Sequence, residues 1–133
     1  MYEFTVPGRP VGKGRPRVTR RAITYTPKKT RDYEALVKGY AKAASVEPLE
    51  GPVSISVHFT LLMAKSWPKV KRRSFAGKYV SQRPDLDNML KAIMDALDGI
   101  AYSKDSQVAS IHASKMWTDN PALEGANVYI DPL

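Results

Sequence analysis

Residues 53–63 restrict the fold more than any other part of the chain, because apolar side chains stand there at every second position. The series is Val53, Ile55, Val57, Phe59, Leu61 and Met63. Since successive side chains of a strand point to opposite faces, this period of two predicts a β-strand with one buried face. One strand cannot bury that face alone, so the chain needs a sheet and a layer that covers it.

Helical periodicity in two other segments predicts the covering layer. Apolar residues recur at intervals of three and four along residues 30–44, and a second apolar stripe runs along residues 86–97. Pro84 and Asp85 suit the start of the second helix, and Gly99 suits the left-handed residue that ends it. Two helices of this kind can cover one face of a sheet.

Four other segments predict further strands, at residues 2–6, 23–25, 107–117 and 127–130. Residues 7–21 are rich in Pro, Gly and Arg and are expected to form a loop or arm, whereas the basic residues 65–78 are expected to be partly helical. No repeat or linker divides the chain. We therefore expect an α+β fold in a single compact domain, residues 1–133, with helices packed on a small mixed sheet.

The net charge of +8 is unevenly distributed. Residues 1–73 carry 16 Lys/Arg against 5 Asp/Glu, whereas residues 74–133 carry 5 against 8. A basic half of this kind is typical of proteins that contact nucleic acid, where each neutralised phosphate releases counterions. A solvated surface that favours solubility is the alternative. Binding to a membrane surface fits less well, because the basic residues do not line an amphipathic helix.

Two basic segments hold the candidate DNA contacts. They are Arg15, Arg17, Arg20 and Arg21 in the first segment and Lys69, Lys71, Arg72 and Arg73 in the second. Branched DNA is recognised largely by its shape and backbone, which suits basic loops better than a base-reading helix. Trp67 or Phe75 could stack on an unpaired base, although packing is the commoner role of an aromatic residue beside such a loop.

Several classes of protein are excluded by what the sequence lacks. It has no cysteine, which rules out disulfides and thiolate metal sites. The N-terminus lacks the layout of a signal peptide, and no apolar run is long enough to span a membrane, so we expect a soluble cytoplasmic protein. Residues 8–14 lack the spacing of a phosphate-binding P-loop. His58 and His112 lack the spacing of a zinc site and are expected to be structural.

Three aspartates are the most informative side chains for function: Asp85, Asp87 and Asp105. Mg²⁺ prefers oxygen ligands and is commonly held by one or two carboxylates together with water and substrate phosphates. Carboxylates in a basic protein therefore indicate a place where a divalent metal ion meets a phosphate backbone. Each has a structural alternative, since Asp85 could cap the helix, Asp87 could complement its dipole and Asp105 could occupy a turn.

The length of the intervening helix decides whether one site can hold all three carboxylates. A helix of about 13 residues is ~20 Å long. Asp105 can therefore return to Asp85 only if its strand runs back beside the helix, or if a second subunit brings it there.

Lys91 lies one helical turn after Asp87. It could contact the scissile phosphate or stabilise the charge that develops there. The alternative is an ordinary surface ion pair with Asp87, worth ~0.2–0.5 kcal/mol. Asp95 and Asp98 lie near the C-terminal end of the predicted helix, where anions are unfavourable, and are left out of the site.

Three segments of the chain resemble one known family. Residues 83–97, R-P-D-L-D-N-M-L-K-A-I-M-D-A-L, followed by residues 105–108, D-S-Q-V, resemble the RusA family of Holliday-junction resolvases, which are common in prophages. Residues 8–17, G-R-P-V-G-K-G-R-P-R, are similar to the opening segment of that family. The resemblance spans most of the chain, and the P-D-L-D-N block with its following lysine is its most specific part.

The resemblance implies a small homodimeric endonuclease that depends on Mg²⁺, with Mn²⁺ as a substitute, and cuts four-way DNA junctions by paired nicks in recombination and repair. It implies that Asp85, Asp87 and Asp105 bind the metal and act in catalysis, with Lys91 as the catalytic lysine. Many relatives have two adjacent acidic residues where this chain has Lys104 and Asp105. The expected location is the cytoplasm of a bacterial or phage-infected cell.

Two rival functions stay open at this point. The first is a nuclease of the same build that prefers flaps, forks or other branched DNA. The second is a non-catalytic basic protein that binds nucleic acid, in which the aspartates only cap a helix.

Overall fold

The computed structural model describes residues 1–14, 17–21 and 24–133. The strands are β1 (Tyr2–Pro7), β2 (Arg17–Val18), β3 (Thr24–Tyr25), β4 (Val53–Leu62), β5 (Val108–Thr118) and β6 (Gly125–Pro132). The helices are α1 (Lys28–Ala43), α2 (Lys69–Phe75) and α3 (Leu86–Leu97). Two short 3-10 helices, η1 (Asp105–Gln107) and η2 (Pro121–Leu123), flank β5.

Four of the strands form one mixed sheet in the order β1-β6-β4-β5. Strand β6 pairs antiparallel with both β1 and β4, whereas β4 and β5 run parallel. The alternation predicted for β4 is confirmed, because every second residue from Val53 to Leu61 is buried. Strand β4 therefore occupies the interior of the sheet, and β5 forms one edge.

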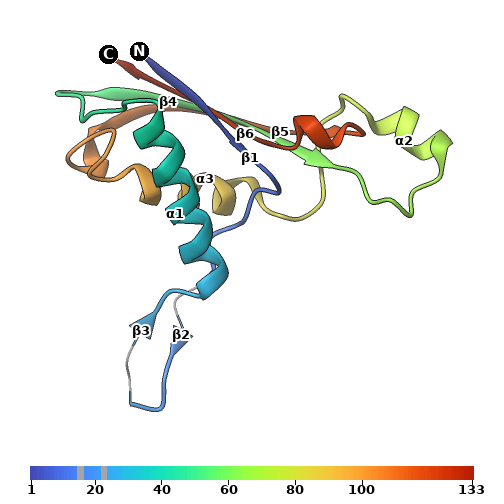
Figure 1. Cartoon of the computed structure of the whole chain (residues 1–133), viewed down its shortest axis with the longest axis horizontal. Coiled ribbons are helices and arrows are strands. Elements are labelled where there is room, and N and C mark those ends of the chain that lie inside the picture. The colour runs from blue at the N-terminus through green and yellow to red at the C-terminus, as the bar shows by residue number, and fades with distance from the viewer. Residues whose placement is uncertain (15–16, 22–23) are drawn as a thin grey trace.

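Helices α1 and α3 lie on the same side of the sheet (Figure 1). Tyr33 and Val37 of α1, together with Met89, Ile93 and Leu97 of α3, are buried in the core that this layer makes. The left-handed backbone of Gly99, with φ of 83°, follows the C-terminal end of α3 as predicted. One layer of helices on a mixed sheet is the α+β fold that the sequence predicts.

The first basic segment forms a structure that the sequence did not predict. Its residues 17–18 pair with residues 24–25 as the antiparallel strands β2 and β3, so the expected loop contains one arm of a hairpin. Figure 1 shows this hairpin projecting from the body of the molecule next to the start of α1. The predicted strand at 23–25 is confirmed for Thr24 and Tyr25, and Ile23 lies outside the described residues.

The second basic segment carries the short helix α2, which has no buried residue. Trp67, just before it, packs against Phe75 and Trp117 with ring centroids 5.7 and 4.9 Å apart. The packing role therefore accounts for Trp67. Within the described ranges, no helix has the length and apolar character needed to cross a membrane.

Candidate active site

Asp85 and Asp87 lie at the N-terminal entry of α3, and both are exposed. Asp85 is the residue before the first helical turn, with φ of −69° and ψ of 137°, but its side chain makes no capping hydrogen bond. Asp87 lies within the first turn, where the helix dipole favours a negative charge. The Asp85 carboxylate therefore does not cap the helix and is accessible to a ligand.

The loop that leads to Asp85 is held by a lysine from the edge strand of the sheet. Lys115 Nζ in β5 donates hydrogen bonds to the backbone oxygens of Gln82, at 2.6 Å, and Pro84, at 2.9 Å. Hydrogen bonds from a charged donor are shorter and stronger than neutral ones. Sequence reasoning gave Lys115 no role, because its two acceptors are backbone groups that leave no pattern in the sequence.

Lys91 is 63% exposed and lies on the outer face of α3. Its Nζ is 4.0 Å from Asp95 Oδ2, an i, i+4 pair. The surface pair expected as an alternative was with Asp87, whereas the observed partner is Asp95, one of the two aspartates that were left out of the site. At this exposure the ammonium group is accessible to a phosphate.

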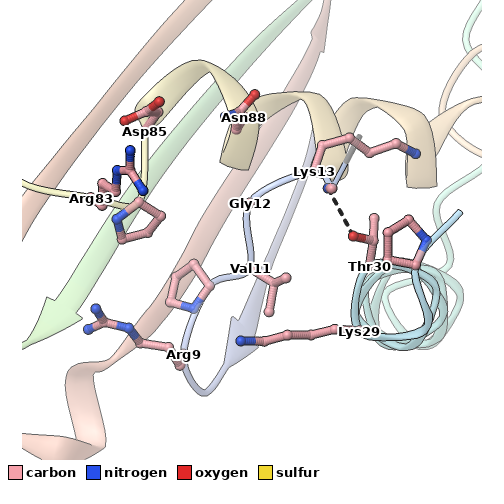
Figure 2. Close-up of a pocket in the computed structure, with 13 residues that line it drawn as sticks. Arg9, Val11, Gly12, Lys13, Lys29, Thr30, Arg83, Asp85 and Asn88 are labelled. Atoms are coloured by element: carbon pink, nitrogen blue, oxygen red, sulfur yellow. Dashed lines mark hydrogen bonds between the residues drawn. The ribbon is translucent and has the colours of Figure 1, made fainter. Parts of the chain in front are cut away.

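A hollow of about 910 Å³ opens beside Asp85. It is lined by residues from three parts of the chain: Arg9, Pro10, Val11, Gly12, Lys13, Gly14, Pro27, Lys29, Thr30, Arg83, Pro84, Asp85 and Asn88. Figure 2 shows Arg83 next to Asp85, with Lys29 reaching in from α1 and Arg9 on a third side. One carboxylate therefore shares the hollow with several cationic side chains. Arg9, Lys29 and Arg83 were missed as candidate contacts, although all three belong to the basic residues of the sequence.

The N-terminal segment that forms one wall of the hollow is tied to both helices. Lys13 Nζ lies 2.6 Å from Glu34 Oε1 of α1 and 3.0 Å from Asp95 Oδ2 of α3. Its backbone N–H also donates to the oxygen of Asn88, at 2.9 Å. Burial acts to lower the pKa of Lys13, but the hydrogen bonds and charges of Glu34 and Asp95 outweigh it and raise that pKa. Lys13 is thus held by ion pairs within the fold. This agrees with the prediction that residues 8–14 do not form a phosphate-binding P-loop.

Asp105 lies at the opposite end of α3 from Asp85 in a single chain. In the parallel register of β4 and β5, Val108 is opposite Val53 and Lys115 is opposite Phe59. Lys115 reaches the entry of α3, and the seven residues back to Val108 span roughly 23 Å of strand. Asp105 precedes Val108, so it stands a full helix length from Asp85.

The surroundings of Tyr102 agree with this position. Burial, followed by the charges of Asp98, Asp95 and Asp105, raises the pKa of Tyr102 above its usual value. The Tyr102 hydroxyl donates to the oxygen of Met94, 2.7 Å away in the last turns of α3. Asp105 therefore shares the C-terminal end of α3 with the two aspartates that were left out of the site.

Gln107 fixes the turn that carries Asp105. Its side-chain oxygen accepts hydrogen bonds from the backbone N–H groups of Ser103 and Lys104, and its amide donates to the oxygens of Leu49 and Gly51. The glutamine of the D-S-Q motif is thus a structural residue that holds Asp105 beside the start of β4.

The three predicted metal ligands are not brought together within one chain. Among the residues that the structure describes, no three His, Cys, Asp or Glu side chains gather closely enough to hold a metal ion. The sequence left two routes by which Asp105 could reach Asp85, namely a strand that runs back beside the helix or a second subunit. The first route does not occur, because β5 leaves Asp105 at the far end of α3. The role of Asp105 as a metal ligand, and its supply by a second subunit, stay predictions.

The predicted DNA contacts lie on two separate projections. Arg20 and Arg21 are exposed at the turn of the β2–β3 hairpin, whereas Arg15 and the side chain of Arg17 lie outside the described residues. Lys69, Lys71 and Arg73 are exposed on α2, and Arg72 is half-buried. Lys71 Nζ stacks over the ring of Trp67, 4.0 Å from its centroid.

The two histidines lie on the face of the sheet away from α1 and α3. His58 Nδ1 is 2.8 Å from Ser114 Oγ, and its ring packs edge-on against His112 and Tyr129. These contacts agree with the structural role that was expected for His58 and His112.

Comparison with known proteins adds two findings. The family model described as endodeoxyribonuclease RusA matches residues 7–125 of the chain. The chain is also similar to the uncharacterized protein YqaN of Bacillus subtilis (strain 168), with 33% identity over an alignment 132 residues long that covers 92% of each protein. The matched range includes the hollow, the entry of α3 and the turn that carries Asp105.

Proposed function

Because this chain belongs to the RusA endodeoxyribonuclease family, we propose that it resolves Holliday junctions by paired, symmetric nicks in a reaction that depends on Mg²⁺. The observation that carries the proposal is the shared hollow, in which the uncapped carboxylate of Asp85 stands beside cationic side chains. That arrangement suits a phosphodiester that must be held and cut in one place. We propose that residues 1–133 act as one nuclease domain.

The residues at the entry of α3 fit a magnesium ion. Asp85 and Asp87 supply two exposed carboxylates, and Mg²⁺ is commonly held by one or two carboxylates plus substrate phosphate and water. We propose that Asp105 joins them as the third ligand. A bound Mg²⁺ would supply positive charge that polarises the phosphoryl group and makes an attacking water more acidic, and Mn²⁺ could replace it.

Lys91 is proposed to stabilise negative charge on the phosphate during hydrolysis. It lies on the same face of α3 as Asp87 and is largely exposed. A preorganised cation aimed at developing charge is among the largest contributions to catalysis. Arg83, which lies beside Asp85, is proposed to hold the same DNA strand in place.

The DNA partner is proposed to contact the basic surface around the hollow. The hairpin with Arg20 and Arg21 and the helix α2 with Lys69, Lys71 and Arg73 would contact the backbone of the junction arms. A two-fold symmetric junction needs two equivalent cuts, which a homodimer supplies. The proposed setting is recombination and repair of DNA in the cytoplasm of a bacterium that carries a prophage or is infected by a phage.

Cleavage of matched substrates tests the proposal. Four-way, three-way and linear DNA of the same sequence would be incubated with the protein and Mg²⁺, and initial rates compared. We expect the four-way junction to be cut fastest and linear duplex hardly at all. Equal rates on all three substrates would rule out the resolvase function, and salt-sensitive binding without any cleavage would favour a non-catalytic binding protein.

A further inference from the structure

Residues 64–78 form an arm that carries helix α2 beyond the end of the sheet (Figure 1). The base of this α2 arm is attached to β5, because Trp67 packs against Trp117 and Gly77 N–H donates to the oxygen of Trp117, 3.0 Å away. Phe75, at the end of α2, packs on Trp67 with ring centroids 5.7 Å apart. The helix that these contacts anchor has no buried residue.

Helix α2 lacks the features that usually stabilise so short a helix. It has seven residues, whereas isolated helices shorter than about 12–15 residues are marginal in water. Pro68 precedes it without a capping hydrogen bond from a side chain, and its first turn has no acidic residue to complement the helix dipole. Packing, capping and dipole interactions therefore contribute little to this helix.

The charges of the α2 arm oppose its helical form. Residues 64–78 contain six Lys/Arg and no Asp/Glu, and none of the six forms an ion pair with a residue that the structure describes. Lys69 lies three residues before Arg72 and four before Arg73, so like charges are neighbours on the helix surface and repel. Arg72 Nε is also buried without a hydrogen-bond partner among the described residues, which costs further free energy. An outside source of negative charge would therefore stabilise the helix.

We propose that the phosphates of the DNA backbone supply this charge: in the free protein α2 exchanges between the helix and an unfolded form, and binding to DNA fixes the helix. Lys69, Lys71 and Arg73 are exposed and accessible to phosphates. Phosphates that neutralise these cations remove the repulsion between them. Segments that fold on binding use part of the binding free energy for ordering, so formation of the helix is coupled to contact with DNA.

DNA fits the α2 arm better than a membrane surface does. The apolar residues of the helix are Val70, which is 81% exposed, and Phe75, which packs against Trp67. A helix that lies on a membrane needs a broad apolar face, which these two residues do not make. The inference rests on the proposed function for the identity of the DNA, a four-way junction, but it does not depend on cleavage.

Hydrogen exchange of the backbone amides tests the coupling directly. The N–H groups of Arg72 and Ala76 donate to the oxygens of Pro68 and Arg72, so their exchange reports whether α2 is formed. Exchange would be measured for the free protein and for the protein with a four-way junction in Ca²⁺. We expect fast exchange of these amides in the free protein and at least about tenfold slower exchange with the junction. Ala92 and Ile93, buried in α3, should exchange slowly in both states.

A charge reversal separates ordering of the helix from simple shielding by bound DNA. Lys69→Glu places an acidic side chain in the first turn and turns two repulsive pairs into attractive ones. In the free variant, α2 should therefore exchange at least about threefold more slowly than in the free wild type. The same variant should bind the junction more weakly, because it loses a phosphate contact. Lys38→Glu, the matched change at an exposed position of α1, should leave the exchange of α2 unchanged.

The proposal is overturned if α2 of the free wild type exchanges as slowly as α3, or equally fast with and without the junction. It is also overturned if Lys69→Glu does not slow the exchange of free α2, or if vesicles of anionic lipid protect α2 and the junction does not. If the junction orders α2 in a protein that never cuts it, the inference stands and the proposed function fails. If the junction is cut while α2 exchanges equally in both states, the inference fails and the proposed function stands.

Discussion

Cationic side chains around the hollow differ in what neutralises them. Lys13 is held between Glu34 and Asp95, and Arg9 Nη1 lies 3.4 Å from Glu124 Oε2. Within the described residues, no carboxylate lies within ion-pair distance of Lys29 or Arg83. The sequence shows all four only as basic residues, so the structure separates the cations that hold the fold from those that remain open to a phosphate.

Lys29 is expected to contact DNA through this hollow. Binding depends less on salt when the protein neutralises one phosphate fewer, so Lys29→Ala should reduce the slope of log K against log salt by about 0.9 for a four-way junction. Binding would be measured with Ca²⁺ in place of Mg²⁺. Lys42→Ala, which removes the same charge from an exposed position near the other end of α1, should leave the slope unchanged. A slope for Lys29→Ala equal to that of the wild type would contradict the contact.

Asp87 is expected to be essential for cleavage but not for folding. Asn keeps the size of the side chain and removes the charge that a magnesium ligand supplies, so Asp87→Asn should lower the rate of junction cleavage by roughly a hundredfold or more. Because Asp87 is exposed, the thermal unfolding midpoint of the Asp87→Asn variant should stay close to that of the wild type. Cleavage at near the wild-type rate in Mg²⁺ would show that Asp87 is not a metal ligand.

At the scale of elements, the edge strand β5 positions the entry of α3. The Lys115 ammonium group joins β5 to the loop at Gln82 and Pro84, and this loop sets where Asp85 stands. A displacement of about 1 Å in a catalytic group can cost a hundredfold in rate. Lys115 is therefore a positioning residue in this account.

Lys115→Met should lower the cleavage rate at least about tenfold, because it removes two charge-assisted hydrogen bonds to the loop. Junction binding in Ca²⁺ should change little, since Lys115 faces the loop and not the hollow. Lys115→Arg keeps the charge and the donors and should recover much of the rate. If Lys115→Met and Lys42→Met cleave equally well, the loop does not depend on this strand.

Local patterns predicted the elements and missed how some of them pair. The buried face of β4 and the limits of α3 follow from periodicity and from Pro84, Asp85 and Gly99, all of which act within a few residues. The β2–β3 hairpin was missed because two pairs of residues leave almost no periodic signal. The hollow was missed because it depends on contacts between distant segments, such as Lys13 with Asn88.

The sequence singled out the aspartates and Lys91 of the candidate site, but it did not show the cations around the hollow or how the site is assembled. Asp85, Asp87 and Lys91 belong to one helix and its entry, so their proximity follows from helical geometry. The place of Asp105 depends on the parallel register of β4 and β5, which no local pattern sets. The sequence could state only that a returning strand or a second subunit was required.

At the scale of the molecule, the charge distribution and the fold agree. The basic first half of the sequence supplies the hairpin, α2 and much of the wall of the hollow, whereas the acidic second half supplies α3 and the carboxylates. The fold thus places a cationic surface beside the exposed carboxylates at the entry of α3. The proposed homodimer would hold two such entries, which matches the two-fold symmetry of a four-way junction.

Mapping the nicks on a four-way junction tests the central claim most directly. Each strand would be labelled in turn, the junction incubated with the protein in Mg²⁺ or in EDTA, and the products resolved at single-nucleotide length. We predict nicks at symmetric positions in two opposing strands, present with Mg²⁺ and absent with EDTA. Tight binding without nicks, or cleavage that persists in EDTA, would contradict the account.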